Sequence, residues 1–518
     1  AHHSIPHHES PNAIRYRWLS LGILSVQPEL AYTKKLDTEQ SFHCLTRPKE
    51  EHPRQAGMKQ KTIEPDRVKR LNDRPVRDKA FVLYWMQQSQ RAEYNHALEY
   101  AFLQANRLRQ PLLVGFGLTD SYPEANRRHY RFLLEGLAET GRALSERGSA
   151  LVVRCGSPPD VALQLGRNAS LIVCDRGYLR HQQQWRQTVA EEAQCRVFQV
   201  ESDLTVPVER ASDKTEYAAR TLRPKLHKLY AEFARLPAVV ETASDAKGLS
   251  EKGEDLSDID SLLARLAAKD PPQPVTSLHC GGTRQAKRQF EQFLDSEFQQ
   301  YSANRNQPHT DAVSYMGMYL HFGQISPVWL LLKAREADSA AESRDAFIEE
   351  LLVRRELAAN YTFYTADYDQ FRSLPEWAQR TLEEHRNDPR SPAYQRDTLE
   401  KAETHDAYWN AAMQQMKMTG YMHNYMRMYW GKKILEWSES PETAFENALY
   451  LNNKYFLDGR DPNSYASIAW IFGRHDRAWQ ERPIYGKVRC MTAKGLERKC
   501  NMQAYLEKVA RYRRINRT

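Results

Sequence analysis

Oxidisable rings and a positive charge share one short stretch of this sequence. Trp430 and Trp437 lie seven residues apart and Arg427 lies three residues before Trp430, so all three fall on one face of an α-helix. Trp409 comes from the preceding segment and can approach this face. Aromatic rings on such a face are usually core, but a buried guanidinium needs an anionic partner. The pattern therefore favours a redox cofactor beside a paired arginine, with plain core packing as the alternative.

Two acidic residues are candidates for the same chemistry. Glu350 lies in the helix-like segment AFIEELLVRRELAANYTFY, and its simpler interpretation is the solvent end of a charged helix. Asp458 lies in YFLDGRDPNSYAS, where Asp-Gly and Asp-Pro-Asn predict tight loops. It is one candidate partner for Arg427, although a loop aspartate more often caps a turn. No HExxH motif, catalytic-triad order or His/Cys ligand spacing is persuasive, so we expect no metal site.

Positive charge is concentrated at the C-terminal end of the chain. The formal net charge is +8, and the stretch from Arg460 to Thr518 holds fourteen lysines and arginines against five acidic residues. Trp470, Trp479 and two tyrosines are interleaved with these cations, which suits phosphate contacts combined with base stacking. The sequence therefore predicts nucleic-acid binding, with a solvated basic tail as the alternative for residues 511–518.

Two kinds of sequence pattern predict the structural elements that position these residues. Short apolar runs alternate with amphipathic helical segments in the first half, which predicts a parallel α/β sheet. The runs are 81–86, 111–118, 149–156, 169–175 and 196–202. No GxGxxG or GxxxxGK[ST] motif accompanies them, so the sheet alone does not imply a nucleotide. Residues 287–450 are helical in pattern, which predicts an all-α C-terminal domain.

Composition sets the outer limits. At 518 residues, 41% hydrophobic and 27% charged, the chain can form two or three domains. Seven cysteines without a CxxC pair indicate a reducing intracellular compartment, cytoplasm or nucleus (nucleoid), and no apolar run predicts a membrane helix. We expect a disordered or non-native extension over 1–67, an α/β domain over 68–235, a linker with a short helix (261–268) over 236–286, and a helical domain over 287–518.

Motifs in these segments resemble the class II cyclobutane pyrimidine dimer photolyases of the photolyase/cryptochrome superfamily. The resemblance covers about Val68 to Leu506 and includes KAFVLYWMQQSQRAEYNHAL and KTEYAARTLRPKL in the first half. In the second half it is carried, in order, by MYLHFGQIS, EELLVRRELAANYTFY, YMRMYWGKKILEWSESPE, YLNNKYFLDGRDPNSYASIAW and HDRAW. The combination is far more specific than any one of these motifs.

The resemblance implies a flavoprotein with a Rossmann-like antenna domain and a helical domain that holds FAD. In that family, light drives electron transfer from the fully reduced anionic flavin (FADH−) to a cyclobutane dimer flipped out of the DNA, and the dimer splits. The expected partner is therefore UV-damaged DNA. The protein is expected to be a monomer that does not contact a membrane. The α/β domain could also hold an antenna chromophore, either a deazaflavin or a folate, or none, and no residue of the sequence discriminates among these three.

The resemblance also assigns roles to particular residues. Arg427 and Asp458 are expected to form a salt bridge beside the flavin, with Asn452 facing its protonatable ring nitrogen. The other expected FAD-binding residues are Tyr301, Ser314, Met316, Gly317, Gln324, Asp461 and Asn463. Glu350 is expected to bind the dimer, and the remaining lesion and DNA contacts are Arg305, Asn306, Arg354, Met428, Trp470, Arg477, Trp479 and Arg489. Trp430 and Trp409 form the expected electron relay, with Tyr394 and Trp437 as outlets.

The chain departs from the family in a segment expected to hold the FAD phosphates. Family members usually have a Ser-Pro pair where this chain has Gly317 and Met318, so one hydroxyl donor is lost. Arg354 stands where some members have tryptophan and others arginine, and Asn424 where glycine is common. Two other functions stay open. One is a cryptochrome-like photoreceptor without repair activity, and the other is a light-independent nucleic-acid-binding protein.

Overall fold

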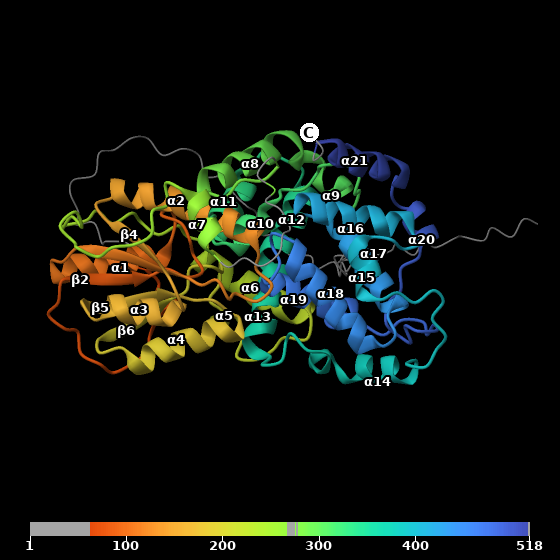
Figure 1. Cartoon of the computed structure of the whole chain (residues 1–518), viewed down its shortest axis with the longest axis horizontal. Helices are drawn as coiled ribbons and strands as arrows, with labels where there is room; N and C mark the ends of the chain where they lie inside the picture. Colours follow the sequence, from red (N-terminus) through yellow and green to blue (C-terminus); the bar gives the residue numbers. More distant parts are fainter. Residues whose placement is uncertain (1–62, 267–274, 276–277, 516–518) are drawn as a thin grey trace, which may run out of the picture. The chain divides into compact units, whose positions relative to one another are not determined.

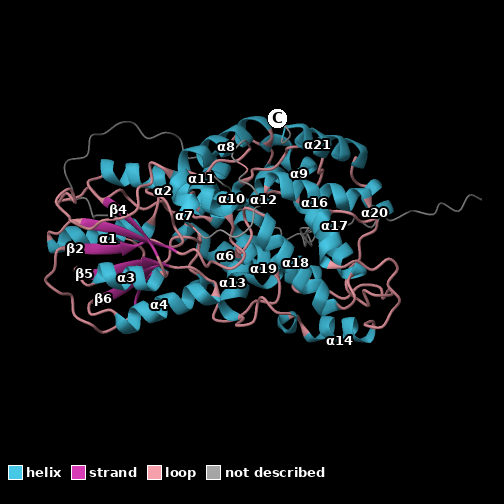
Figure 2. Cartoon of the chain, in the orientation of Figure 1, coloured by secondary structure: helices cyan, strands magenta, loops and turns pink. Residues whose placement is uncertain are grey.

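The structure, a computed structural model, describes residues 63–266, 275 and 278–515 (Figure 1). Its first part is a six-stranded sheet with helices on both faces (Figure 2). The strand order is β1-β6-β5-β2-β3-β4, and every neighbouring pair is parallel except β1 with β6. The strands are β1 (Val68–Arg70), β2 (Phe81–Trp85), β3 (Leu112–Leu118), β4 (Ala150–Cys155), β5 (Ala169–Asp175) and β6 (Arg196–Val200).

The rest of the described chain is helical, and beyond β6 the described residues contain no further strand, only an isolated bridge between Arg482 and Gly486. The first helices are α1 (His96–Leu108), α2 (Arg127–Glu146), α3 (Pro158–Gly166), α4 (Arg180–Glu192), α5 (Val208–Ala211), α6 (Ala219–Phe233) and α7 (Ile259–Arg265). They are followed by α8 (Thr283–Ser296), α9 (Tyr301–Asn304), α10 (Met316–His321), α11 (Pro327–Glu336), α12 (Ala341–Ile348), α13 (Arg355–Tyr364) and α14 (Glu376–Glu384). The last are α15 (Arg396–Lys401), α16 (Ala407–Thr419), α17 (Asn424–Trp437), α18 (Pro441–Tyr455), α19 (Pro462–Ile471), α20 (Ala493–Glu497) and α21 (Met502–Ile515). The predicted fold class, a parallel α/β part followed by an all-helical part, is confirmed.

The sheet is buried because its central strands are apolar on both faces. In β2, Val82 and Tyr84 join the core that α1 covers, whereas Phe81, Leu83 and Trp85 join the core that α3 and α4 cover. The apolar runs of the sequence therefore predicted five of the six strands. The prediction missed β1, because this edge strand is only three residues long and reads Val-Lys-Arg.

The boundaries of the α/β part involve two further segments. The predicted N-terminal extension lies outside the described residues up to residue 62. Arg67 is buried and donates to the backbone oxygens of Leu204 and Thr205 at 3.1 and 2.7 Å, which fixes the start of β1 to the segment after β6. The predicted short helix at 261–268 is present as α7 but begins two residues earlier, because Asp258 caps it by accepting from the Ser261 amide.

The tryptophan-rich segment folds as two helices joined at Gly420. Asp406 caps α16 by accepting hydrogen bonds from the amides of Tyr408 and Trp409. The helix ends at Gly420, whose φ of 70° favours glycine and where a Cβ would lie 2.8 Å from Leu457 Cγ. Because α16 packs against α17, the Trp409 side chain is brought to the helix that carries Trp430.

The first turn of α2 fixes the α/β part to the segment that carries Asp458. Arg128 donates to the backbone oxygens of Met416 at 3.2 Å and Tyr455 at 2.7 Å. The Nε2 atom of His129 lies 3.0 Å from the backbone oxygen of Phe456. Carbonyl groups at the C-terminal end of α18 thereby gain partners that the helix itself does not supply.

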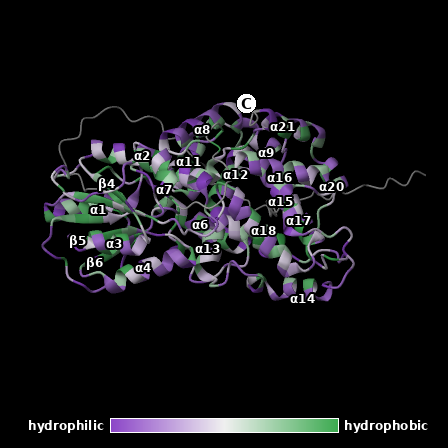
Figure 3. Cartoon of the chain, viewed as in Figure 1, coloured by the Kyte–Doolittle hydropathy of each residue, from purple (hydrophilic) through white to green (hydrophobic). Residues whose placement is uncertain are grey.

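The hydropathy of the chain follows this architecture. In Figure 3 the strands of the sheet are hydrophobic, and hydrophilic residues are distributed over the helices. Within the described ranges, no helix combines the length and apolar character needed to cross a bilayer. The six cysteines that the structure describes are free thiols.

Candidate functional site

An ion pair at the N-terminal half of α17 is the centre of the candidate site. Arg427 Nη2 lies 3.0 Å from Asp458 Oδ1 and 3.1 Å from Oδ2, as the sequence analysis expected for a partner of Arg427. The Nε atom of Arg427 donates to the backbone oxygen of Met422 at 2.9 Å, and the guanidinium lies 3.8 Å from the centre of the Phe456 ring. These contacts hold the pair in place. The Arg427 and Asp458 side chains are 20% and 21% exposed, so the pair stays accessible.

Gly317 lies directly against this pair. A Cβ at Gly317 would lie 2.8 Å from Asp458 Oδ2, so a larger residue would push the carboxylate away from α10. The preceding turn is held by Ser314, whose hydroxyl accepts a hydrogen bond from the Met316 amide at 3.4 Å. The unusual glycine in this segment therefore has a structural reason, which is the close approach of Asp458.

Asn452 is held at the end of α18 beside the loop that carries Asp458. It is 3% exposed, and its Nδ2 donates to Asn453 Oδ1 at 3.0 Å. Asn453 Oδ1 in turn accepts from the Arg460 amide at 3.0 Å, which fixes the orientation of both amides. The loop folds back so tightly that a Cβ at Gly459 would lie 2.9 Å from the Asn452 backbone oxygen.

The aromatic side chains form a continuous row that starts at this pair. The Phe456 and Trp430 ring centres are 6.4 Å apart, Trp430 and Trp409 are stacked at 6.5 Å, and Trp409 and Trp437 are 5.7 Å apart. The row ends at Tyr394, 5.5 Å from Trp437. We call this set, from Phe456 to Tyr394, the tryptophan row. Its three tryptophans are at most 3% exposed and belong to the core of the helical part, so the row is also core packing.

Glu350 lies in a π-helical turn, Glu349–Arg354, that separates α12 from α13. Such turns are frequent at functional sites because they change which side chains a helix presents. Glu350 Oε1 lies 2.6 Å from Arg305 Nη2, and its side chain keeps 27% of its exposure. Glu349 instead pairs with Arg223 at 2.8 Å and with Arg354 at 3.0 Å. The turn therefore presents two acidic side chains to separate arginines.

Cations and rings alternate in a second aromatic group near the C-terminus. The Arg489 guanidinium lies 5.5 Å from the Trp470 ring centre and 3.9 Å from that of Trp479. Lys432 Nζ lies 5.2 Å from the Trp470 ring centre, and the Arg477 guanidinium lies 4.9 Å from that of Trp479. We call these five residues the surface stack.

Asp476 neutralises the central cation of the surface stack. It accepts two hydrogen bonds of 2.9 Å from Arg489, and both side chains are under 10% exposed. Burial opposes the charge of Asp476, but the bonds to Arg489 prevail and lower the pKa of this carboxyl. The exposed Arg477 is therefore better placed to meet a phosphate than Arg489.

The other predicted residues are dispersed around these groups. Gln324 is fully buried and bonds to the Phe132 backbone oxygen at 3.1 Å and the Gly282 amide at 2.8 Å. Asp461 caps α19 by accepting from the Asn463 amide at 2.8 Å and lies 3.3 Å from His321 Nδ1. Tyr301 and Met316 are buried in the aromatic core around α8 and α12. Met428 is 6% exposed, and the backbone oxygen of Asn306 accepts from the Cys500 thiol.

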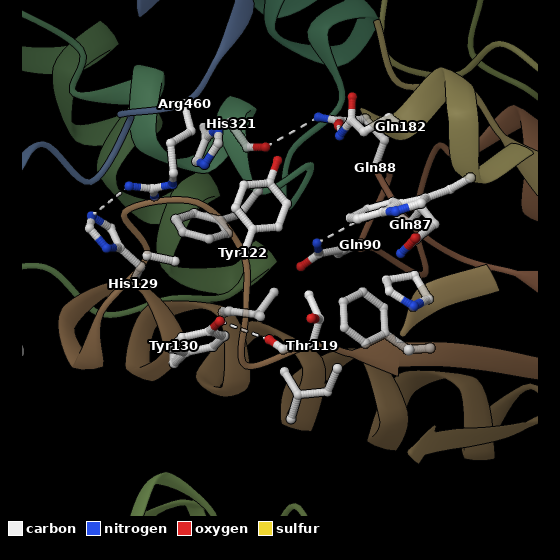
Figure 4. Close-up of a pocket in the computed structure, with 18 residues that line it drawn as sticks. Gln87, Gln88, Gln90, Thr119, Tyr122, His129, Tyr130, Gln182, His321 and Arg460 are labelled. Carbon is white, nitrogen blue, oxygen red and sulfur yellow. Dashed lines mark hydrogen bonds between the residues drawn. The ribbon is translucent and has the colours of Figure 1, made fainter. Parts of the chain in front are cut away.

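A cavity of about 90 Å³ lies in the α/β part, where the carboxyl ends of β2 and β3 meet residues of the helical part (Figure 4). Ligands of open α/β sheets bind at this edge. Figure 4 shows amide, hydroxyl and aromatic side chains around the space. Its labelled lining residues are Gln87, Gln88, Gln90, Thr119, Tyr122, His129, Tyr130, Gln182, His321 and Arg460. Sequence reasoning missed this site, although the polar run Gln-Gln-Ser-Gln directly after the first apolar strand was a usable signal.

Comparison with known proteins decides the family. A family model described as DNA photolyase matches residues 82–243. A deoxyribodipyrimidine photo-lyase of Methanothermobacter thermautotrophicus is 47% identical over 448 residues, which are 86% of this chain and 98% of that protein. The chain belongs to the DNA photolyase family. A deoxyribodipyrimidine photo-lyase of Arabidopsis thaliana is 36% identical to this chain, over 83% of this chain and 88% of that protein.

Solved structures with low sequence identity share the photolyase fold. A class III photolyase from Agrobacterium tumefaciens superposes with a TM-score of 0.66 at 18% identity, covering 84% of this chain and 87% of that one. A cryptochrome from Synechocystis superposes with a TM-score of 0.65 at 13% identity, covering 83% and 88%. Because a photolyase and a cryptochrome fit almost equally well, the fold does not distinguish repair from photoreception.

Proposed function

We propose that this photolyase-family chain repairs cyclobutane pyrimidine dimers in DNA in light, using non-covalently bound FAD. The observation that carries the proposal is the position of the Arg427–Asp458 pair at the start of the tryptophan row. A fixed pair of charges can hold a polar redox ring, and the adjoining rings can carry electrons to it. The names and the identities of the curated relatives support the same activity.

The residues at the pair fit a flavin. In the described part of the chain, Arg427 uses Nε and Nη2 on Met422 and Asp458, which leaves Nη1 for a ring carbonyl or nitrogen. Asn452 offers an amide that can bind either protonation state of a ring nitrogen. When bound, FAD would supply light absorption and reversible electron transfer at this site. Arg427, Asp458 and Asn452 would hold and orient it.

Separate residues would bind the lesion and the DNA. Glu350 would accept a hydrogen bond from a pyrimidine ring N–H or, when protonated, donate one to a pyrimidine carbonyl, and Arg305 keeps this side chain in place. A dimer has to leave the base stack to reach a buried site. Trp479 would fill the gap by stacking, and Arg477 would contact a phosphate.

The cavity in Figure 4 would hold part of the antenna chromophore. Its glutamine side chains supply both donors and acceptors, which suits the hydrogen-bonding edge of either a deazaflavin or a folate. Extraction of the purified protein followed by chromatography would show whether a deazaflavin, a folate or neither is present, and neither would contradict this assignment.

The deciding experiment is repair of UV-irradiated oligothymidine by the reduced protein, in blue light and in darkness. We expect thymine absorbance to recover only in light, and to recover much more slowly with Glu350→Ala although flavin stays bound. Glu342→Ala, an exposed acid on the neighbouring α12, serves as the control and should repair normally. No recovery despite bound flavin would contradict repair and favour a photoreceptor. Absence of both flavin and repair would favour a light-independent nucleic-acid-binding protein.

A further inference from the structure

The tryptophan row ends in a tyrosine that is hydrogen-bonded to a histidine. The Tyr394 ring lies 5.5 Å from Trp437, and the His405 ring lies 5.1 Å from the same tryptophan. The hydroxyl of Tyr394 lies 2.9 Å from His405 Nδ1. All three rings are therefore in contact at the end of the row farthest from Arg427.

Two backbone bonds fix the position of Tyr394. Its amide donates to the backbone oxygen of Trp437 at 2.9 Å. Its hydroxyl oxygen accepts a hydrogen bond from the His405 backbone amide, also at 2.9 Å. The hydroxyl oxygen accepts in that bond and keeps its single proton, which it can donate to Nδ1 at 2.9 Å. When it does, the imidazole carries its own proton on Nε2.

Within the described residues, the indole N–H groups of Trp409 and Trp430 have no contact with water. Trp409, Trp430 and Trp437 are at most 3% exposed. The indole N–H of Trp409 donates to the Trp430 backbone oxygen at 2.9 Å, and the Trp430 indole N–H is buried without a partner in the part of the chain that the structure describes. His405 is exposed, so a proton that it accepts can pass to solvent.

We propose that His405 accepts the phenolic proton of Tyr394 when Tyr394 is oxidised, so that the relay ends in a proton-coupled tyrosine–histidine pair. Tyr394 loses one electron to the Trp437 radical cation, its O–H bond breaks, and an N–H bond forms at Nδ1. The products are neutral Trp437, a neutral tyrosyl radical and a protonated His405. The inference rests on the proposed function, since Trp437 is oxidised only when an electron has passed along the row to light-excited oxidised flavin.

The physical reason is charge. A radical cation inside the apolar core is desolvated and unpaired, which is costly. Transfer of electron and proton together from Tyr394 removes the charge from the core and places it on an exposed imidazole. The return of the electron from the flavin side is then opposed, because the tyrosyl radical would have to regain its proton.

Transient absorption and electron paramagnetic resonance of the full-length, flavin-loaded protein test this pair. We expect a tyrosyl radical after a light flash in the native protein and none in Tyr394→Phe. In His405→Phe, which keeps the backbone amide, tyrosyl formation should slow by roughly 100-fold or more, the lower end of the usual effect of a positioned base. His227→Phe, an exposed histidine on α6 beside Tyr230, is the matched control and should behave as native. Added imidazole should restore the rate in His405→Ala, because the site is open to solvent.

Each outcome separates this inference from the proposed function. A native tyrosyl rate in His405→Phe, or tryptophan radicals without any tyrosyl radical in the native protein, would overturn the role of His405 and leave the relay intact. Absence of all radicals, unchanged by Trp430→Phe, would overturn the relay and this inference with it. Nitrogen-15 resonances of His405 provide a readout without flavin or light. The Nε2-protonated tautomer should dominate and be lost in Tyr394→Phe, and an Nδ1-protonated ring in the native protein would overturn the assignment.

Discussion

The tryptophan row and the surface stack use the same ring type in opposite surroundings. In the row, neighbouring ring centres are 5.5 to 6.5 Å apart and the tryptophans are almost fully buried. In the surface stack, each ring lies between cations, and Arg489 comes within 3.9 Å of Trp479. Only the stack reaches an exposed arginine, Arg477.

This difference indicates what each group can do. A cation a few ångströms from a ring opposes removal of an electron, because positive charges repel in a poorly solvated site. The surface stack is therefore poorly suited to carry oxidising equivalents, but well suited to stack on bases and meet phosphates. In the row, Arg427 and Lys433 lie 3.8 Å from Phe456 and 5.6 Å from Trp437, but each is paired with a carboxylate, Asp458 and Glu436. Within the described residues no cation lies over Trp409 or Trp430, and these two rings suit electron transfer. The neighbours of a tryptophan, rather than the residue type, assign its role.

Trp430→Phe is expected to have the largest effect on the property that distinguishes the row from the stack, electron transfer. Phenylalanine fills most of the space but is far harder to oxidise, so we expect photoreduction of bound flavin to be lost. Repair by chemically pre-reduced protein should persist. Trp85→Phe, an equally buried tryptophan in β2, is the control and should photoreduce normally. Loss of both photoreduction and repair in Trp430→Phe would show a packing role instead.

Asp476→Ala removes the carboxylate that neutralises Arg489, the central cation of the surface stack. The change leaves the Arg489 guanidinium buried without its partner, which should lower the free energy of unfolding by about 3–5 kcal/mol. Urea unfolding measures it, and photoreduction per folded molecule should not change. The control is Asp367→Ala, which removes a 2.9 Å pair with the exposed Arg372 and should cost under about 1 kcal/mol. Equal losses in both variants would contradict the burial argument.

Lys432 of the surface stack makes the stability of the protein depend on pH. Burial lowers the pKa of this lysine to about 7, with Arg489 acting in the same direction and Asp476 and Cys490 opposing the shift. The unfolded lysine therefore binds more protons between about pH 7 and 10, and stability from this group should rise with pH across that window. Lys432 should contribute at most about 1.4 kcal/mol per pH unit to the slope, and Lys432→Met should remove this contribution. Identical slopes in the two proteins would refute the assignment.

Trp479→Ala should have the smallest of these effects and act on DNA only. Loss of one stacking ring should weaken binding to a dimer-containing duplex by about 1–3 kcal/mol, with photoreduction unchanged. Arg477→Ala is the matched comparison. It should lower the slope of log K against log salt concentration by about one, whereas Trp479→Ala leaves this slope unchanged. A changed slope in Trp479→Ala would mean that the ring positions cations rather than bases.

Sequence reasoning reached the local features of this molecule. Continuous apolar runs predicted β2 to β6, and the spacing of Arg427, Trp430 and Trp437 predicted one helix face. It missed β1, whose pairing with β6 depends on a partner far along the chain rather than on its own residues. It also missed the cavity of Figure 4, because that space forms only when two strand ends meet loops from the helical part.

The sequence by itself determined the periodic elements, since helix and strand depend on neighbours a few residues away. It also determined that Arg427 required an anion, because desolvating a charge without one is costly. The sequence analysis offered Asp458 as one candidate, and the tertiary structure pairs it with Arg427 at 3.0 Å. Only the tertiary structure showed that Asp476 neutralises Arg489. It alone placed His405 against Tyr394 and made glycine necessary at position 317. The charge and size of a residue determine which kind of neighbour it requires. The packing of distant segments determines which residue becomes that neighbour.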